Sequence, residues 1–500
     1  SYYLNVTEPS NTTLYSVTNL GNSSIRINWQ NNSDTKLDKY CTYQSRTGQS
    51  NSFSPVSTST KSVTSQDFSG LDTNSIYYFY ISGQNKIGIE SSPSSTYSVR
   101  VCKNKSKILI VCDPNSYPTF YSDSLGEYFP FDYCYYYAVD SGFIDLKQYK
   151  VVIWYSGSYY GRPDSTSRSK IQNFLENGGN LFLSGSYITQ SLGYTGFPAN
   201  YLKAVYQSSA NSEYSIYGQT GTVFDGKNFG ITTWASGAPS GGAYYTNAEV
   251  ISSSGASTTC LKYNSGGGAG VQYSGTFGTS TTTAKLIYFS FPFECIASRE
   301  NRRDVIISVM KFFGFDLPAV SNASVPVSVK GNSLAISGSA GANDTVYVYV
   351  NDELVNTIQC DSTGKFELMV AGKLKFGENN IKIVTVDSNG IGSKPVTYKV
   401  TYSVASENLK SIKVYPNPFL PSNGHKEISF ANLPLNCEIK IFNIAGEIIK
   451  SISETNNYDS LVKWSASNDS GVEVASGIYI YHIEDKNTGE KKTGKVMIIR

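Results

Sequence analysis

The polar residues that could do chemistry follow four apolar runs in the middle of the chain. The runs read KILIVCD from Lys107, VVIWYSG from Val151, NLFLSGS from Asn180 and KLIYFSFPF from Lys285. Asp113 and Glu294 follow the first and last of these runs, and a carboxylate pair can act as general acid and base on a glycoside. The candidate catalytic residues are therefore Asp113, Ser186 and Glu294. Candidate ligand-binding residues close to the run ends are Ser156, Gly157, Ser184, Tyr159 and Tyr160.

The elements that would position these residues are strands that alternate with helices. Continuous apolar runs of this length are typical of buried parallel strands. SKIQNFLEN from Ser169 has helical spacing and ends at a Gly-Gly pair, and RENRRDVIISVMKFF from Arg299 predicts an amphipathic helix ending at Gly314. This alternation predicts a doubly wound α/β sheet. Such sheets bind ligands in a crevice at the carboxyl ends of their strands, where the candidate residues would gather.

The same segments resemble the class I glutamine amidotransferase-like superfamily. More closely, they resemble the α/β module of secreted bacterial proteins named xanthan lyases or N-acetylmuramoyl-L-alanine amidases. The resemblance implies a catalytic Cys on a strand-to-helix turn, with a His and a carboxylate. Here that turn, Leu183 to Tyr187, carries serine instead of cysteine, and both histidines, His425 and His482, lie near the C-terminus. A serine without a general base is a poor nucleophile, so we expect a degenerate, non-catalytic domain.

Two tyrosine-rich segments are candidates for a binding surface. SYYGRPD from Ser158 and FDYCYYYAVD from Phe131 have the composition of loops or sheet edges. Tyrosine offers a flat apolar face with a polar end, which suits stacking on sugars or contact with proteins. The alternative is that half of these rings point into the core.

The N-terminal and third segments are predicted to be all β. Residues 1–102 alternate with period 2 and resemble a fibronectin type III domain, with Trp29 in an early strand and Tyr78 and Tyr80 in a late one. Residues 319–403 resemble the bacterial Ig-like modules of secreted enzymes, with short strands separated by Asp, Asn and Gly turns. The α/β domain then occupies residues 103–318.

Residues 404–500 carry the most specific local pattern. It reads YPNPF from Tyr415, ISFANLP from Ile428, IKIFNIAGEII from Ile439 and GVEVASGIYIYHI from Gly471. This pattern resembles the Ig-like C-terminal domain of type IX-secreted bacterial proteins and of the flagellar hook-cap protein. In type IX substrates that domain is a sorting and surface-attachment signal, usually removed after export. The predicted fold class is therefore β-sandwiches, fibronectin III and Ig-like, flanking one doubly wound, flavodoxin- or amidotransferase-like α/β domain.

The charge balance, the length of the apolar runs and the cysteine spacing exclude several classes of function. The balance of 41 Lys and Arg against 39 Asp and Glu excludes a basic nucleic-acid footprint. No apolar run approaches the roughly 20 residues of a membrane helix. The eight cysteines form no CxxC or Cys/His cluster, so we expect no metal and no cofactor; they are buried thiols or form one or two bridges, such as Cys41–Cys102. The chain starts at Ser1 without a signal-like segment, which favours a processed mature chain or a fragment.

Three functions remain after these exclusions. The leading hypothesis is a non-catalytic extracellular or cell-surface protein, the adhesive region of a larger secreted protein, whose partner is a polysaccharide or another component of the cell envelope. The second is a structural subunit of a surface layer or filament, whose partners are copies of itself. The third is a glycan-acting hydrolase that works through Asp113 and Glu294.

Overall fold

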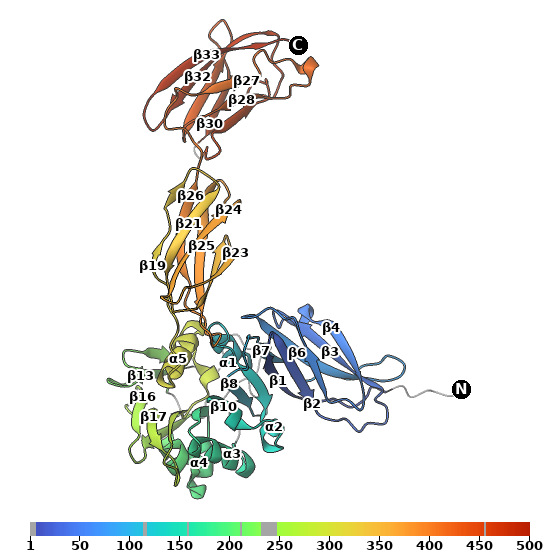
Figure 1. Cartoon of the computed structure of the whole chain (residues 1–500), viewed down its shortest axis with the longest axis vertical. Coiled ribbons are helices and arrows are strands. Elements are labelled where there is room, and N and C mark those ends of the chain that lie inside the picture. Colours follow the sequence, from blue (N-terminus) through green and yellow to red (C-terminus); the bar gives the residue numbers. More distant parts are fainter. Residues whose placement is uncertain (1–6, 114–117, 158–159, 211–212, 232–247, 455–456) are drawn as a thin grey trace, which may run out of the picture. The chain divides into compact units, whose positions relative to one another are not determined.

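A computed structural model describes residues 7–113, 118–157, 160–210, 213–231, 248–454 and 457–500 (Figure 1). By internal contacts the chain falls into two compact units. The first is residues 1–318 with 386–392, and the second is residues 319–385 with 393–500. Most of the regular structure is strand, in several sheets, so the protein is a multidomain β-sandwich protein.

In the N-terminal sandwich, three strands at the end of a larger sheet face a sheet of four strands. Trp29, Tyr40 and Phe79 fill the space between the sheets and are almost fully buried, as expected for alternating strands with one apolar face. A short 3-10 turn, η1, spans Ser50–Ser52. The strands of the first sheet are β1 (Leu14–Gly21), β2 (Ser24–Trp29) and β5 (Ser65–Phe68), and those of the second, in order, are β4 (Ser54–Thr60), β3 (Lys39–Ser45), β6 (Ile76–Gln84) and β7 (Tyr97–Arg100).

Five parallel strands form the centre of the first unit. Each hydrogen-bonds to its neighbour in the same direction, and side chains such as Ile153 and Leu183 are fully buried. The predicted apolar runs therefore do form strands. In spatial order they are β9 (Asp132–Tyr135), β8 (Ile108–Cys112), β10 (Val151–Gly157), β11 (Asn180–Gly185) and β18 (Thr283–Phe289).

Helices pack on both faces of these strands. Val151, Ile153 and Tyr155 share one core with α1 and α5, whereas Val152 and Trp154 share another with α2, α3 and α4. Asp164 caps α3 by accepting a hydrogen bond from the Ser167 backbone N–H. The helices are α1 (Pro118–Leu125), α2 (Tyr136–Asp140), α3 (Ser165–Glu176), α4 (Ile188–Leu192) and α5 (Arg299–Phe312), with short turns η2 (Leu146–Gln148), η3 (Gly193–Thr195), η4 (Pro198–Leu202) and η5 (Phe293–Cys295).

Both sides of the parallel strands are extended by antiparallel ones. Beyond β18 the sheet continues with β17, β16, β13 and β14, while β12 and β15 pair beside them. These strands are β12 (Ala204–Ser209), β13 (Ser215–Gly218), β14 (Asn228–Gly230), β15 (Glu249–Ser253), β16 (Thr258–Tyr263) and β17 (Gly268–Thr276). On the other side β9 pairs with β1 of the N-terminal sandwich, so one 14-stranded sheet continues from the parallel strands into that sandwich.

A buried polar contact reinforces the β1–β9 pair. The Asn19 backbone N–H and side-chain amide each donate to one oxygen of Asp132, at 2.8 Å, and the Tyr149 hydroxyl donates to the other at 2.9 Å. Burial raises the pKa of the Asp132 carboxyl to about 7, against the opposing effect of these donors. The seam between the N-terminal sandwich and the parallel strands therefore contains a carboxyl group whose pKa is raised to about 7.

The second unit contains two further β-sandwiches. In the first, β19 (Ser321–Ser324), β21 (Ser333–Ser339) and β24 (Lys365–Ala371) form one sheet. The facing sheet, in order, is β20 (Ser328–Val329), β26 (Val396–Tyr402), β25 (Gly377–Val386), β22 (Thr345–Val350) and β23 (Glu353–Gln359). In the C-terminal one, β27 (Lys413–Tyr415), β28 (Ile428–Ala431) and β31 (Leu461–Trp464) face β30 (Ile448–Glu454), β29 (Cys437–Phe442), β32 (Gly477–Asp485) and β33 (Lys491–Ile498), and η6 spans Pro421–Asn423.

One type of turn recurs in the β regions. At Asp361 the carboxylate accepts from the backbone N–H groups of Thr363 and Lys365, at 2.8 and 2.9 Å, and Gly364 has a φ of +83°. Glycine is suited to that left-handed position because it has no Cβ. The same pattern of an Asp or Asn followed three residues later by a left-handed glycine occurs at Asn85, Asp387, Asn443 and Asn468.

All eight cysteines are buried free thiols, so the possible bridges, including Cys41–Cys102, are not formed. Burial raises the pKa of the Cys112 and Cys102 thiols to about 12. These residues act as small core side chains.

Candidate functional site

The predicted site residues do gather at one edge of the sheet. Asp113 directly follows β8, Ser156 and Gly157 end β10, and Ser184 and Ser186 stand at the end of β11. Glu294 lies in η5, shortly after β18. Because these strands are parallel, their carboxyl ends share one edge, as the sequence pattern predicts. Tyr159 lies outside the described residues.

Asp113 is held in a closed ion-pair network. Its carboxylate accepts from the Trp154 indole N–H at 3.0 Å, from the Ser156 hydroxyl at 2.9 Å and from Arg162 Nε at 2.8 Å. A second Arg162 nitrogen also contacts Asp113, and a third pairs with Asp164 at 2.6 Å. Desolvation raises the pKa of Asp113, and the guanidinium works against that rise.

Arg162 also covers the network from outside. Its guanidinium lies 3.8 Å above the centre of the Tyr136 ring, a cation–π contact. The Asp113 side chain has no exposed area, and that of Arg162 is only 12% exposed. The carboxylate is therefore neutralised and shielded by the chain's own side chains.

Glu294 belongs to a different network. The Tyr121 hydroxyl donates to Glu294 at 3.0 Å and also hydrogen-bonds to the Ser184 hydroxyl. The Tyr121 ring stacks on Tyr155, with 4.3 Å between ring centres. Glu294 and Ser184 are both buried. The two candidate carboxylates thus bond to different side chains, and each is covered by an aromatic or cationic group.

The turn after β11 contains one residue with a left-handed backbone. Tyr187, and not Ser186, has the left-handed backbone conformation, with a φ of +60°. Ser186 is buried, and its backbone N–H donates to the Gly157 carbonyl at 2.8 Å. The left-handed position of this turn is therefore held by Tyr187, and the serine next to it is buried.

A carboxylate of the protein occupies the start of the helix after this turn. Glu249 accepts from the backbone N–H of Thr189 at 3.1 Å and from that of Gln190 at 2.7 Å. The Tyr288 hydroxyl donates to it at 3.3 Å, and burial raises the pKa of this carboxyl. Free N–H groups at such a position commonly bind anions, but here the chain supplies the anion itself.

The tyrosine-rich segments divide between surface and core. Tyr160 is 68% exposed, and its ring lies 6.0 Å from that of Tyr187. The prediction of a loop or edge at 131–140 is wrong in its first half, because β9 is bonded on both sides and Tyr133 is buried. Tyr137, in α2, is 46% exposed. Aromatic density in the sequence does not by itself indicate a surface.

Three residues that the sequence analysis did not select complete these networks: Arg162, Tyr121 and Glu249. Arg162 is 49 residues from Asp113, and Tyr121 is 173 residues from Glu294. No local sequence motif therefore links these partners. Within the described ranges, no group of three or more His, Cys, Asp or Glu could hold a metal ion. Nor does any helix of those ranges have the length and apolar content to cross a membrane.

Together, the sandwiches define a modular, mostly β protein. Residues 413–499 match the family model of the secretion system C-terminal sorting domain. The protein is therefore secreted to the cell surface or the extracellular space. No curated protein matches the chain.

Several solved structures are similar to the chain or to parts of it. PorZ of Porphyromonas gingivalis, a surface component of its type-IX secretion system, is 19% identical over 36% of this chain and 23% of its own, with a TM-score of 0.18. A Fn3-like protein of Clostridium thermocellum is 18% identical over 19% of this chain and 95% of its own (TM-score 0.17). The FN1–FN3 domains of chicken CNTN1 are 8% identical over 99% of this chain and 100% of their own (TM-score 0.22). The chain thus spans about a quarter of PorZ.

Proposed function

We propose that this protein is a non-catalytic, surface-exported adhesion module that binds polysaccharide or another component of the cell envelope. The observation that carries the proposal is the occupied sheet edge. Arg162 pairs with Asp113, Tyr121 bonds to Glu294 and Ser184, and Glu249 caps the helix after β11. A substrate would have to displace these groups before reaching any candidate catalytic residue.

The proposal treats residues 103–318 as a doubly wound, amidotransferase-like domain that has lost its activity. The strand order β9, β8, β10, β11, β18 supports it, because numbered along the chain this is the order 2-1-3-4-5 of flavodoxin-like sheets. Helices on both faces support it as well. The proposed neighbours are a fibronectin type III domain at 1–102 and Ig-like domains at 319–403 and 404–500.

The test uses the full chain on a panel of purified bacterial-envelope and plant polysaccharides. Retention of the protein without release of reducing sugar is the expected result. Asp113→Asn and Glu294→Gln are assayed beside it. Sugar release by the wild type that both variants abolish would overturn the proposal and establish the hydrolase function through this carboxylate pair.

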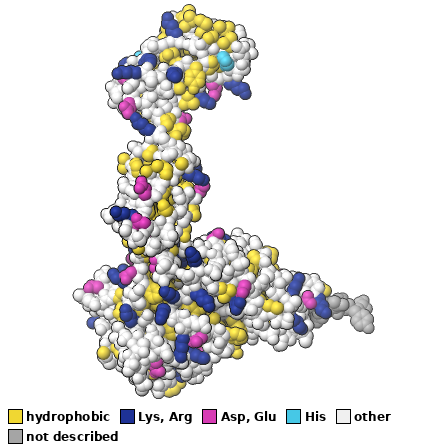
Figure 2. Space-filling view, in the orientation of Figure 1, with side chains coloured by type: hydrophobic (Ala, Val, Ile, Leu, Met, Phe, Trp, Pro, Cys, Tyr) yellow, Lys and Arg dark blue, Asp and Glu magenta, His cyan; other side chains and the backbone are white. Residues whose placement is uncertain are grey.

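A second candidate, a self-assembling surface subunit, is favoured by apolar side chains on the C-terminal sandwich. Ile444 is 81% exposed, Val472 61% and Ile448 55%, and Figure 2 shows hydrophobic side chains on the visible face of this domain. Surfaces of this kind commonly mark interfaces. Light scattering of the purified chain separates the two functions, because a subunit gives regular polymers and an adhesion module stays monomeric.

A further inference from the structure

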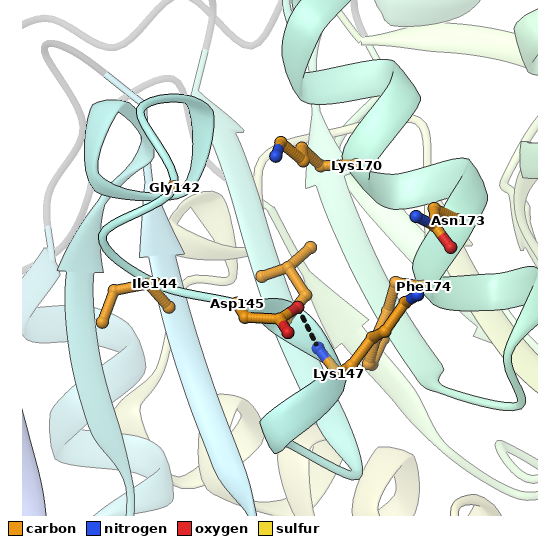
Figure 3. Close-up of a pocket in the computed structure, with 8 residues that line it drawn as sticks. Gly142, Ile144, Asp145, Lys147, Lys170, Asn173 and Phe174 are labelled. Atoms are coloured by element: carbon orange, nitrogen blue, oxygen red, sulfur yellow. Dashed lines mark hydrogen bonds between the residues drawn. The ribbon is translucent and has the colours of Figure 1, made fainter.

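A groove away from the sheet edge is lined by two exposed lysines. It lies between the segment that leads into η2 and the side of α3, and it has a volume of about 350 Å³. Figure 3 shows side chains from both elements around it. Its lining residues, which we call the lysine groove, are Gly142, Ile144, Asp145, Leu146, Lys147, Lys170, Asn173 and Phe174.

The lysine groove has an apolar base and a polar rim. Leu146 and Phe174 are buried, whereas Lys147, Lys170 and Asn173 are exposed. A pocket with an apolar base and a few polar groups is the usual form of a small-molecule site. Its volume of about 350 Å³ lies at the lower end of the range of small-molecule sites.

The charge of the rim favours an anion. Of the ionised groups, Lys147 and Lys170 contribute two ammonium ions against the single carboxylate of Asp145. That carboxylate is engaged in capping η2, where it accepts from the Lys147 backbone N–H at 3.0 Å (Figure 3). Across the described ranges, neither ammonium group lies within 4.0 Å of a carboxylate, in contrast to the guanidinium of Arg162.

An exposed aromatic cluster adjoins the groove. Phe143 stands between the lining residues Gly142 and Ile144 and is 64% exposed. The Tyr15 ring of β1 lies 5.6 Å from Phe143 and 5.5 Å from Tyr137. Exposed rings that are fixed by a buried neighbour offer flat faces on which sugar rings can stack at a small entropic cost.

We propose that the lysine groove and this aromatic cluster bind an anionic polysaccharide. One sugar ring of the polymer packs on Phe143 and Tyr137, and a carboxylate or sulfate elsewhere on the polymer lies between the ammonium groups of Lys147 and Lys170. The inference rests on the proposed function, since it names the ligand class and the place where a surface-exported adhesion module would hold it. It uses none of the candidate residues at the sheet edge.

The experiment measures binding of the full chain to immobilised polygalacturonate, dextran sulfate and neutral dextran. Lys147→Gln with Lys170→Gln removes both ammonium groups, and Lys61→Gln with Lys86→Gln is the control with the same change of charge on exposed lysines elsewhere. The groove variant should weaken binding about tenfold, and Phe143→Ser about fivefold. The control should leave it unchanged, and added salt should weaken the wild type more than the groove variant.

The outcomes separate the inference from the proposed function. Preference for polygalacturonate identifies the carboxylate, and preference for dextran sulfate the sulfate, as the anion. Equal binding to dextran, or equal losses in the groove and control variants, overturns the inference while leaving a polysaccharide-binding module in place. If the chain binds none of these polymers and no polysaccharide of the wider panel, both the inference and the proposed function are overturned.

Discussion

The sheet edge and the lysine groove both contain charged side chains. Those at the edge are buried and bonded within the chain, whereas those in the groove are exposed. At the edge, Asp113 and Glu249 are buried and bonded to groups of the same chain. In the groove, Lys147 and Lys170 are exposed beside a cavity. A buried charge is retained only when paired, because desolvation would otherwise cost too much. Charged residues beside a strand end therefore indicate structure as readily as function, and it is their exposure and pairing that separate the two.

The largest effect should come from opening the Asp113 network. Arg162→Met leaves the Asp113 carboxylate buried without its cation, and we expect the free energy of unfolding to fall by about 3–5 kcal/mol. Urea denaturation measures it, and hydrogen exchange in β8 and β10 locates it. Lys399→Met, which breaks an exposed pair with Glu378, is the control and should cost less than about 1 kcal/mol. Equal effects would mean that the sheet edge is not a closed structural network.

A smaller loss should follow when Glu249 is neutralised. Glu249→Gln replaces an acceptor of the Thr189 and Gln190 N–H groups with an amide that has only one acceptor oxygen. One buried N–H then loses its partner, and we expect the free energy of unfolding to fall by about 2 kcal/mol. Faster exchange of the Thr189 and Gln190 amides is the local measurement. Protection as strong as in the wild type would show that these amides do not depend on the Glu249 charge.

Asp132 sharpens the comparison, because its carboxyl has neutral donors, Asn19 and Tyr149, in place of an arginine. Its pKa of about 7 in the folded protein exceeds the roughly 3.9 of an unfolded aspartate. The folded state then holds the proton more tightly, so stability should fall as pH rises from about 4 to about 7 and level off above, by at most about 1.4 kcal/mol per pH unit. Thermal unfolding measured at a series of pH values tests this, and Asp132→Asn should remove the fall in stability between about pH 4 and pH 7. If the variant loses stability over this range as the wild type does, other groups cause the pH dependence.

The smallest effect on stability is expected in the groove. Lys147→Gln with Lys170→Gln should change the free energy of unfolding by less than about 0.5 kcal/mol, because both side chains are exposed. Thermal unfolding of the variant measures it. A loss comparable to that of Arg162→Met would remove the contrast between the two regions.

Local chemistry explains which parts of the fold the sequence predicts. The apolar runs at Lys107 and Val151 are long enough to be buried strands, and both are. The turns at Asp361 and Asn443 each need a side-chain acceptor and a left-handed glycine three residues later, and the sequence supplies both. Signals that act within five residues can be read from the chain.

The candidate site depends on contacts that are not local. Arg162 reaches Asp113 across 49 residues, and Glu249 reaches Thr189 across 60. DYCY, from Asp132, reads as an exposed aromatic segment, yet its burial results from pairing with β1, more than 100 residues earlier. The sequence thus predicts the edge where the polar residues meet, whereas their bonding depends on which distant side chains fill the space between strands.

The shared sheet has a consequence for how the chain can be divided. A cut near residue 102 separates β1 from β9 and leaves each with an unpaired edge. Bare strand edges recruit strands of other molecules and promote aggregation. The N-terminal sandwich thus covers the outer edge of β9, and we expect residues 103–318 expressed alone to aggregate more readily than residues 1–318.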